Sequence, residues 1–207
     1  MSDWIKASPM FTGIISAVGE VQAISRENGA KLTLSVPFAT DDVAIGASLA
    51  CNGICLTVTG KGQKTLSFEA SQETLERTTL GAWAAGAPVN LERPLKAGDE
   101  LGGHMVMGHV DGVSKITAIE PIEGGQALTL TLPGAIAHLV AEKGSITLDG
   151  VSLTVNGIGK DTFSVVLIPH TGAVTTFGDL KAGDKVNVEA DVFARYSARL
   201  QELKGNR

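Results

Sequence analysis

Two stretches of the chain place a small nucleophilic side chain two residues before a threonine. Cys55 and Thr57 belong to the sequence Gly-Ile-Cys-Leu-Thr-Val. Ser152 and Thr154 belong to Gly-Val-Ser-Leu-Thr-Val, at an offset of 97 (152 − 55). Because side chains alternate along a strand, each pair shares one face, where its thiol or hydroxyl groups could bond a ligand or act as nucleophiles. The alternative is that these residues only pack as ordinary strand formers.

The same offset relates much more of the two halves than these phrases. The matched pairs include Val43-Ala44 with Val140-Ala141, Thr78-Thr79 with Thr175-Thr176, Val89-Asn90 with Val186-Asn187, and Glu92 with Glu189. Together they give roughly 20 identities over about 50 gap-free positions, and the offset is the size of a domain. The sequence therefore predicts two copies of one domain.

The copies differ at positions where chemistry could need them to differ. His109 stands where the first copy has Ile14, and a histidine in one copy alone is an acid–base candidate because it titrates near neutral pH. The alternative is a structural histidine in a glycine-rich turn. Asp149 stands where the first copy has Asn52, which could bring a carboxylate near a reacting centre or simply form a turn.

The remaining histidine of this region does not suggest a metal site. His104 lies five positions before His109, and the chain has only two cysteines, Cys51 and Cys55. These side chains do not form a recognisable set of metal ligands. We therefore interpret His104 as structural and expect no metal.

Short strands must position these groups. Each half shows about six polar–apolar alternations with glycine-rich turns between them, which favours an all-β fold with a small antiparallel barrel in each half. We expect strands over 13–15, 18–24 and 108–110, a buried strand through each repeated phrase, and short helical stretches over 39–45 and 135–142. The predicted divisions are an extension 1–9, barrels 10–103 and 104–191, and a C-terminal part 192–207.

The end of the chain predicts an amphipathic helix. Phe193, Tyr196, Leu200 and Leu203 follow one another at spacings of three and four, which gives a narrow apolar stripe. The stripe could dock on its own barrel or bundle with the same helix of other subunits.

Charge and composition limit the partners. The net charge of −5 argues against nucleic acid or an anionic membrane, and the sequence contains no apolar run of the length a membrane helix needs. Cys51 and Cys55 lie in one apolar stretch whose strand geometry disfavours a disulfide, so we expect a reducing cytoplasm.

Several motifs carry a resemblance to a known family. They are Met10-Phe11-Thr12-Gly13-Ile14, Asn52-Gly53-Ile54-Cys55-Leu56-Thr57-Val58, Gly102-Gly103-His104, Gly108-His109-Val110, Asp149-Gly150-Val151-Ser152-Leu153-Thr154-Val155 and Ile168-Pro169-His170-Thr171. From Met10 onward the chain resembles riboflavin synthase of the alpha-chain type. The resemblance implies two tandem six-stranded Greek-key barrels from an internal duplication and a C-terminal α-helix that assembles a homotrimer. It also implies dismutation of two 6,7-dimethyl-8-ribityllumazine molecules into riboflavin and a ribitylamino-pyrimidinedione, without metal or organic cofactor.

The resemblance implies one lumazine site in each half, with the two reacting sites supplied by different subunits. The first site would use Gly13, Ile14, Ile15, Cys55, Leu56, Thr57, Glu69, Ala70, Ser71, Gln72, Glu73 and Thr74. The second would use Gly108, His109, Val110, Ser152, Leu153, Thr154, Val166, Leu167, Ile168, Pro169, His170 and Thr171, with Lys143 nearby. Association with lumazine synthase is a further expectation.

The implied chemistry begins with loss of a proton from the C7 methyl group of one lumazine, with His109 or a hydroxyl relay as base. A nucleophile from Ser48, Cys55 or Thr154, or hydroxide, would add to C7 of the second lumazine, and the carbanion would attack C6. Asp191 would assist later proton transfers, and Ser152 and Asp149 complete the catalytic candidates.

Two other functions remain open at this point. The same fold serves lumazine- and flavin-binding fluorescent proteins, so the chain could be a carrier that binds without turnover. It could also be a duplicated barrel for an unrelated small molecule, although this would leave the motifs unexplained. A carrier that needs only one pocket would be free to lose Ser152, Thr154 and His109, which are all present.

Overall fold

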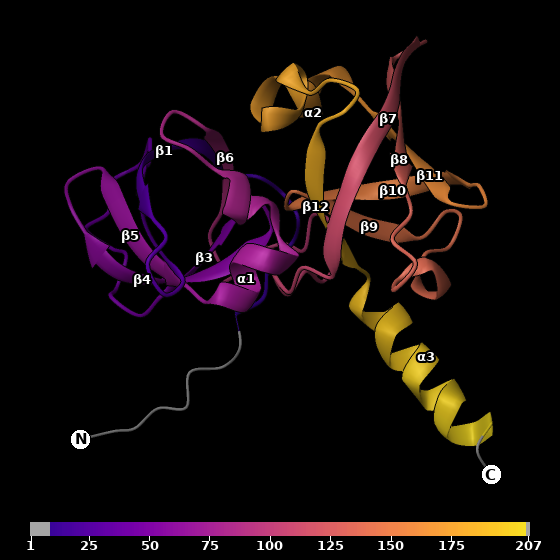
Figure 1. Ribbon diagram of the computed structural model, residues 1–207, viewed down its shortest axis with the longest axis horizontal. Helices are drawn as coiled ribbons and strands as arrows, with labels where there is room; N and C mark the ends of the chain where they lie inside the picture. Colours follow the sequence, from indigo (N-terminus) through magenta and orange to yellow (C-terminus); the bar gives the residue numbers. More distant parts are fainter. Residues whose placement is uncertain (1–8, 206–207) are drawn as a thin grey trace.

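The computed structural model describes residues 9–205, which form two closed β-barrels followed by a helix (Figure 1). The strands of the first barrel are β1 (Ala17–Ser25), β2 (Ala30–Ser35), β3 (Ser48–Cys51), β4 (Ile54–Lys61), β5 (Thr65–Ala70) and β6 (Pro88–Glu92). Those of the second are β7 (Gly112–Ile122), β8 (Gly125–Thr131), β9 (Ser145–Leu148), β10 (Val151–Ile158), β11 (Thr162–Leu167) and β12 (Lys185–Ala190). The helices are α1 (Gln72–Arg77), η1 (Thr79–Ala82), η2 (Ala137–Leu139), α2 (Pro169–Val174), η3 (Thr176–Asp179) and α3 (Val192–Gly205).

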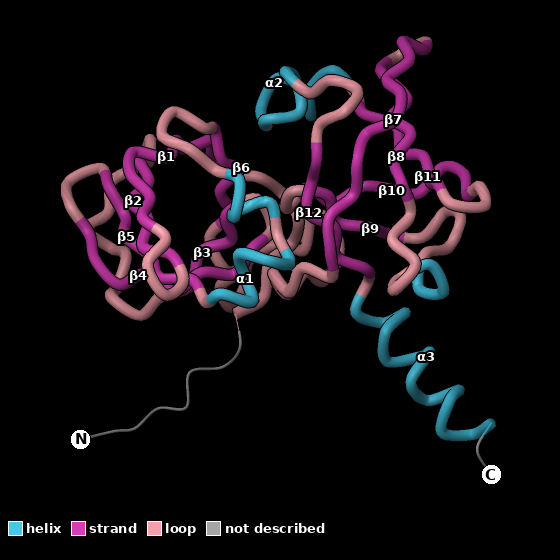
Figure 2. Tube along the Cα trace, in the orientation of Figure 1, coloured by secondary structure: helices cyan, strands magenta, loops and turns pink. Residues whose placement is uncertain are grey.

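Both barrels have the same strand order. The first closes as β1-β2-β5-β4-β3-β6, and the second closes as β7-β8-β11-β10-β9-β12 with every pairing antiparallel. Closure leaves no unpaired sheet edge. Figure 2 shows the two barrels side by side, with α3 leading away from the second. The prediction of an all-β fold with two tandem six-stranded antiparallel barrels and a C-terminal helix is confirmed.

Alternating side chains give each barrel its own core. Leu32, Leu34 and Phe68 are buried inside the first barrel, and Leu128, Leu130 and Phe163 occupy the second. Burying each of these side chains contributes about 1.5–3 kcal/mol. The register shifts recur as well, in β1 and β4 and again in β7 and β10. The duplication therefore extends from the sequence to the irregularities of the sheets.

The barrels meet at two tight turns, which join β3 to β4 and β9 to β10. Asn52-Gly53 and Asp149-Gly150 all have positive φ, as a two-residue turn between such strands requires. A Cβ atom on Gly53 would lie 2.7 Å from the backbone nitrogen of Gly150. The two turns therefore touch backbone to backbone, and glycine is needed for this approach.

Two buried asparagines join the barrels reciprocally. The Asn90 side chain donates to the Asp149 carbonyl at 3.0 Å and accepts from the Thr176 N–H at 2.8 Å. The Asn187 side chain donates to the Asn52 carbonyl at 2.8 Å and accepts from the Thr79 N–H at 2.7 Å. Because all four bonds cross between the halves, they fix the two barrels in a pseudo-twofold arrangement.

Several local predictions were wrong. Residues 13–15 and 108–110 are loops, because their neighbouring backbone groups bond to side-chain carboxylates and to the other half rather than to a strand ladder. Residues 39–45 form turns, and only the single turn η2 forms within 135–142. Each repeated phrase begins at a turn and continues as a strand. The predicted extension 1–9 lies almost wholly outside the described residues, and the domain limits stay predictions.

The apolar stripe of α3 does not dock on its own barrel. Phe193, Tyr196, Leu200 and Leu203 are 65%, 66%, 59% and 50% exposed, respectively. The opposite face of the helix carries the small residues Ala194 and Ala198, which pack against the core of the second barrel. The ion pair between Arg195 and Asp111, at 2.8 Å, also ties the helix to this barrel. The helix is thus held by one face and presents its apolar face outward.

The contact between the two turns gives a stability prediction. We expect Gly53→Ala to lower the free energy of unfolding by more than about 2 kcal/mol, since a clash with Gly150 adds to the cost of a positive φ. Urea unfolding followed by circular dichroism measures the change.

Gly86→Ala is the matched control. Gly86 also has a positive φ, but a Cβ atom there would meet no atom within 4 Å. It should therefore lose only about 1 kcal/mol, from backbone strain alone. Equal losses in the two variants would contradict a role for the turn contact in stability.

Candidate functional site

The segment that precedes each barrel crosses to the other barrel. We call residues 10–16 the first lead segment and residues 105–111 the second lead segment. The Gly13 carbonyl accepts a hydrogen bond from the Ser152 N–H at 2.8 Å, and the Gly108 carbonyl accepts one from the Cys55 N–H at 2.9 Å. A Cβ atom on Gly13 or Gly108 would lie 2.5 Å or 2.6 Å from the Cβ atom of the residue it faces, Ser152 or Cys55. Only glycine permits these contacts.

This crossing corrects the predicted grouping of residues. We expected Gly13, Ile14 and Ile15 beside Cys55, and Gly108, His109 and Val110 beside Ser152. The structure exchanges the two lead segments. Phe11 and Val106, near their starts, pair with each other, and each segment then packs against the other barrel. We call Ser48, Cys55 and Thr57 with residues 108–110 the cysteine site. Ser152, Thr154, Thr147 and His104 with residues 13–15 form the serine site.

The strand register confirms the predicted shared faces. In the first barrel Ser48 lies opposite Thr57, and Ala50 lies opposite Cys55. In the second barrel Ser145 lies opposite Thr154, and Thr147 lies opposite Ser152. Cys55 and Thr57 point away from the barrel core, whereas Leu56 between them is buried in it. The side chain of Leu56 is therefore packed in the core rather than on the candidate binding face.

The thiol of Cys55 is protonated at neutral pH. Burial raises its pKa, the Ser48 hydroxyl opposes this rise, and the negative charge of Glu189 adds to it. Cys51 is fully buried and its pKa is raised by burial beyond the range that matters for chemistry. Cys55 is thus a hydrogen-bond donor as it stands, and it would have to lose its proton before acting as a nucleophile.

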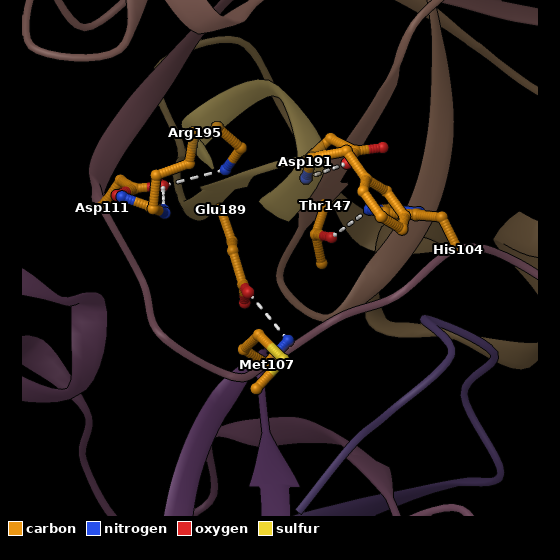
Figure 3. Close-up of polar contacts among 9 residues, drawn as sticks. His104, Met107, Asp111, Thr147, Glu189, Asp191 and Arg195 are labelled. Carbon is orange, nitrogen blue, oxygen red and sulfur yellow. Dashed lines mark hydrogen bonds and ion pairs between the residues drawn. The ribbon is translucent and has the colours of Figure 1, made fainter. Parts of the chain in front are cut away.

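His104 belongs to the serine site, so our interpretation of it as purely structural was incomplete. Its Nδ1 shares a hydrogen bond with the Ser152 hydroxyl at 2.7 Å. Its Nε2 shares one with the Thr147 hydroxyl at 3.1 Å (Figure 3). Burial lowers the pKa of His104, against the opposing charge of Asp191. A neutral imidazole between two hydroxyls can accept a proton at one nitrogen and donate one at the other.

His109 lies in the second lead segment directly after Gly108, so the fold places it at the cysteine site. The residue is exposed, whereas His104 is partly buried. The motif Gly-Gly-His was visible in the sequence, but the contact of His104 with Ser152 spans 48 positions. No periodicity in the chain reveals such a contact.

Two equivalent carboxylates, those of Glu92 and Glu189, hold the lead segments, and they accept different numbers of hydrogen bonds. Glu92 accepts from the Thr12 N–H at 2.6 Å, from the Thr12 hydroxyl at 2.7 Å and from the Gly13 N–H at 3.0 Å. Glu189 accepts from the Met107 N–H at 2.8 Å, and methionine supplies no hydroxyl. Its Oε2 is buried and has no partner among the described residues. Burial raises the pKa of Glu189 to about 7 and also raises the pKa of Glu92.

The two predicted catalytic aspartates have structural partners of their own. Asp149 is buried in the turn between β9 and β10, where its Oδ1 accepts from the Asn187 N–H at 2.7 Å. Asp191, labelled in Figure 3, directly precedes α3, and its Oδ1 accepts from the Phe193 N–H at 2.8 Å. Neither carboxylate bonds to a side chain of the cysteine site or the serine site within residues 9–205. Their catalytic roles stay predictions.

The other predicted binding segments begin short helices. Residues 69–74 run from the end of β5 into α1, where the Ser71 hydroxyl accepts from the Thr74 N–H. Residues 166–171 run from the end of β11 into α2. Leu167, Ile168 and Pro169 line a cavity of about 560 Å³ there, so this segment borders a space large enough for a small ligand. Lys143 is an exposed turn residue with positive φ.

The structure was also searched for groups of metal ligands and for membrane-spanning helices. Across residues 9–205, no three His, Cys, Asp or Glu side chains gather as metal ligands would. None of the helices in the same range has the length and apolar character of a membrane span.

Comparison with known proteins identifies the family. A model of the lumazine binding domain matches residues 12–94 and again residues 107–191. The chain is 46% identical to riboflavin synthase of Brucella abortus over 203 residues, which cover 94% of this chain and all of the relative. It is 45% identical to that of Mycobacterium tuberculosis over 205 residues (95% of this chain, 100% of the relative). The match to that of Bacillus subtilis is 40% over 191 residues (92% and 89%). The chain belongs to the riboflavin synthase family.

Solved structures agree with this membership. The structure of LumP complexed with riboflavin superposes with a TM-score of 0.79 at 25% identity, covering 87% of this chain and 98% of LumP. LumP complexed with 6,7-dimethyl-8-(1'-D-ribityl) lumazine superposes with a TM-score of 0.77 at 24% identity and the same coverage, which supports the fold. The riboflavin synthase family and LumP thus share the double barrel described above.

The difference between Glu189 and Glu92 predicts different effects on stability when each carboxylate is replaced by an amide. The folded-state pKa of Glu189 is raised, so its ionisation costs stability, and this stability is lost as pH rises through about 7. We expect Glu189→Gln to be at least as stable as the parent at about pH 8 and to lose less stability between about pH 5.5 and 8. The side-chain oxygen of the introduced glutamine can still accept the hydrogen bond from the Met107 N–H.

Glu92→Gln is the matched comparison, measured by the same urea titrations. An amide cannot accept from all three donors, so this variant should lose about 1–3 kcal/mol at either pH. Equal destabilisation of the two variants would contradict the difference in how these carboxylates are satisfied.

Proposed function

We propose that this protein converts two molecules of 6,7-dimethyl-8-ribityllumazine into one riboflavin and one 5-amino-6-ribitylamino-pyrimidinedione, by transfer of four carbons from one substrate to the other. The observation that carries the proposal is the 46% identity to a riboflavin synthase over that relative's whole length. The presence of two equivalent sites, each built from both halves of the chain, supports it.

Duplication suits a reaction between two identical molecules. Each substrate needs a site, and holding both in a reactive arrangement supplies much of the rate acceleration. The crossing of the lead segments makes each site depend on both barrels, because Gly13 lies against Ser152 and Gly108 lies against Cys55. Fixing the barrels relative to each other therefore also fixes the walls of each site.

The differences between the sites suggest different roles. In the serine site, the neutral His104 between Ser152 and Thr147 is suited to take a proton from the C7 methyl group of one lumazine through the Ser152 hydroxyl. The electron pair left behind is delocalised into the lumazine ring, and the carbanion attacks C6 of the second lumazine. In the cysteine site, the protonated thiol of Cys55 is suited to donate a hydrogen bond to that electrophile.

The roles carried over from the family stay part of this proposal. His109 and Asp191 are candidates for later proton transfers, and Ser48 and Thr154 are candidates for addition at C7. The substrate-binding roles of residues 69–74, residues 166–171 and Lys143 are proposals of the same kind. We further propose a cytoplasmic location, where the thiols of Cys51 and Cys55 stay reduced.

The partners proposed are further copies of this chain and lumazine synthase. The outward apolar stripe of α3 supports assembly through this helix into a homotrimer, because such side chains gain stability when a partner covers them. In the trimer, reacting sites would come from different subunits.

The first test is turnover. Purified protein is mixed with 6,7-dimethyl-8-ribityllumazine, and both products are followed by chromatography. We expect two lumazines to disappear for each riboflavin formed, at protein concentrations far below that of the substrate. Binding without turnover would instead indicate a carrier.

Variants then test the serine site. Ser152→Ala and His104→Gln should each lower kcat by roughly 100-fold, the usual scale for loss of an acid–base group. His138→Gln is the control, because His138 is exposed on η2. Wild-type kcat in His104→Gln would remove the imidazole from the relay, and the same result in Cys55→Ser or His109→Gln would remove those groups.

Assembly through α3 is tested separately. Leu200→Asp places a charge in the exposed stripe and should shift the protein to the monomer in sedimentation velocity measurements. Gln201→Asp is the control, because it adds the same charge outside the stripe. Dissociation of both variants, or of neither, would contradict assembly through this face of the helix.

A further inference from the structure

The second lead segment lies beside β12 and is bonded to it on both sides of residues 108–110. On one side, the Met107 N–H donates to Glu189 at 2.8 Å (Figure 3). On the other side, Asp111 bonds to β12 twice, because its N–H donates to a β12 carbonyl at 2.8 Å and its Oδ2 accepts from the Ala190 N–H at 2.9 Å. These bonds hold the stretch that forms one wall of the cysteine site.

The side chain of Asp111 also reaches α3. One Nη2 group of Arg195 donates to both carboxylate oxygens of Asp111, at 2.8 Å each (Figure 3). The Asp111 side chain is 12% exposed and that of Arg195 is 41% exposed. Charge-assisted hydrogen bonds to a largely buried carboxylate are stronger than an ion pair between two exposed side chains. Arg195 therefore joins the helix to the segment that forms the wall of the cysteine site.

The first half replaces this ion pair with neutral bonds. Ser16 stands where the second half has Asp111, at an offset of 95 (111 − 16). The N–H and the hydroxyl of Ser16 both donate to the Leu91 carbonyl, at 3.0 Å each. At the offset of 97, Gly98 stands where the second half has Arg195. The link to a helix thus belongs to the cysteine site and not to the serine site.

The positive charge of Arg195 matters because two carboxylates contact the same segment. Burial raises the pKa of Glu189 to about 7, the Met107 N–H opposes this rise, and the negative charge of Asp111 adds to it. Asp111 and Glu189 are therefore close enough to repel each other. Removing Arg195 would leave the charge of Asp111 uncompensated, which weakens the hold on the segment between the two acids.

We propose that Asp111 and Arg195 are positioning residues for the cysteine site, because their ion pair lets α3 hold residues 108–110 against Cys55. The contact at stake is close: the Cys55 N–H donates to the Gly108 carbonyl at 2.9 Å, and a Cβ atom on Gly108 would lie 2.6 Å from that of Cys55. A small shift of the segment therefore changes the shape of this site. The inference rests on the proposed function, in which the cysteine site holds one of the two lumazines.

Amide hydrogen exchange, followed by NMR on the full-length protein, tests the proposal without any substrate. In Arg195→Gln, the Cys55 N–H should exchange about tenfold faster, because residues 108–110 open more often. The Val58 N–H, which donates to a carbonyl within the same barrel at 2.8 Å, should keep its rate within about twofold. So should the Ser152 N–H, which makes the equivalent contact at the serine site.

Variants of the same helix complete the exchange test. Arg199→Gln is the matched control, because Arg199 pairs with the exposed Glu202 at 2.9 Å, and it should leave the exchange of the Cys55 N–H unchanged. Arg195→Lys keeps the positive charge and should stay within about threefold of the parent. Asp111→Asn keeps an acceptor for β12 but loses the ion pair, so it should match Arg195→Gln. Combining these two changes should add less than about twofold.

Turnover supplies a second readout. Once riboflavin formation by the parent is established, Arg195→Gln should lower kcat by roughly three- to tenfold, whereas Arg199→Gln should keep the parent value. The proposal is overturned if exchange of the Cys55 N–H in Arg195→Gln equals that of the parent, or if it rises equally in Arg199→Gln or at Val58. An unchanged kcat in Arg195→Gln would also overturn it. A parent without turnover would remove the proposed function, while the exchange rates would still test the ion pair.

Discussion

The close approach of two tight turns is the contact on which this molecule depends. Gly53 and Gly150 bring backbone against backbone, and Asn90 and Asn187 lock the approach with four hydrogen bonds that cross between the barrels. Once the barrels are fixed in this way, each lead segment can reach across and pack against the repeated phrase of the other half. Both candidate sites follow from that single geometric constraint.

The duplication is conservative in its backbone and divergent in its side chains. Strand order, register shifts, turns and buried asparagines all recur in the second half. The exceptions include Cys55 for Ser152, Asn52 for Asp149 and Ile14 for His109. Thr12 also stands for Met107 beside the carboxylates of Glu92 and Glu189. A nearly symmetric scaffold thus carries different chemistry on its two sides, as a reaction between a donor and an acceptor of the same compound requires.

The sequence predicted those features that depend on residues close together in the chain. Alternation at Cys55 and Thr57 predicted their shared face, and the spacing from Phe193 to Leu203 predicted the exposed stripe. It failed where contacts join distant segments. Nothing near His104 indicates its bond to Ser152, and the loops at Gly13 and Gly108 look like strands until one sees that carboxylates and the other barrel bind their backbone. The offset of 97 revealed that two domains exist, but not how they exchange their lead segments.

The turn at Asn52 and Gly53 also affects how readily the protein is damaged by deamidation. An asparagine followed by glycine is prone to lose its side-chain amide, because the glycine nitrogen can attack the side chain and close a ring. Here the Asn52 side chain is 7% exposed and its Oδ1 is held by the Asn90 N–H at 2.6 Å, which opposes the rotation that ring closure needs. Folding therefore shelters a chemically labile pair. If the amide were lost in an unfolded chain, refolding would have to bury a second carboxylate opposite Asp149. Deamidated molecules would therefore be less stable when folded, because the barrel interface would hold two carboxylates.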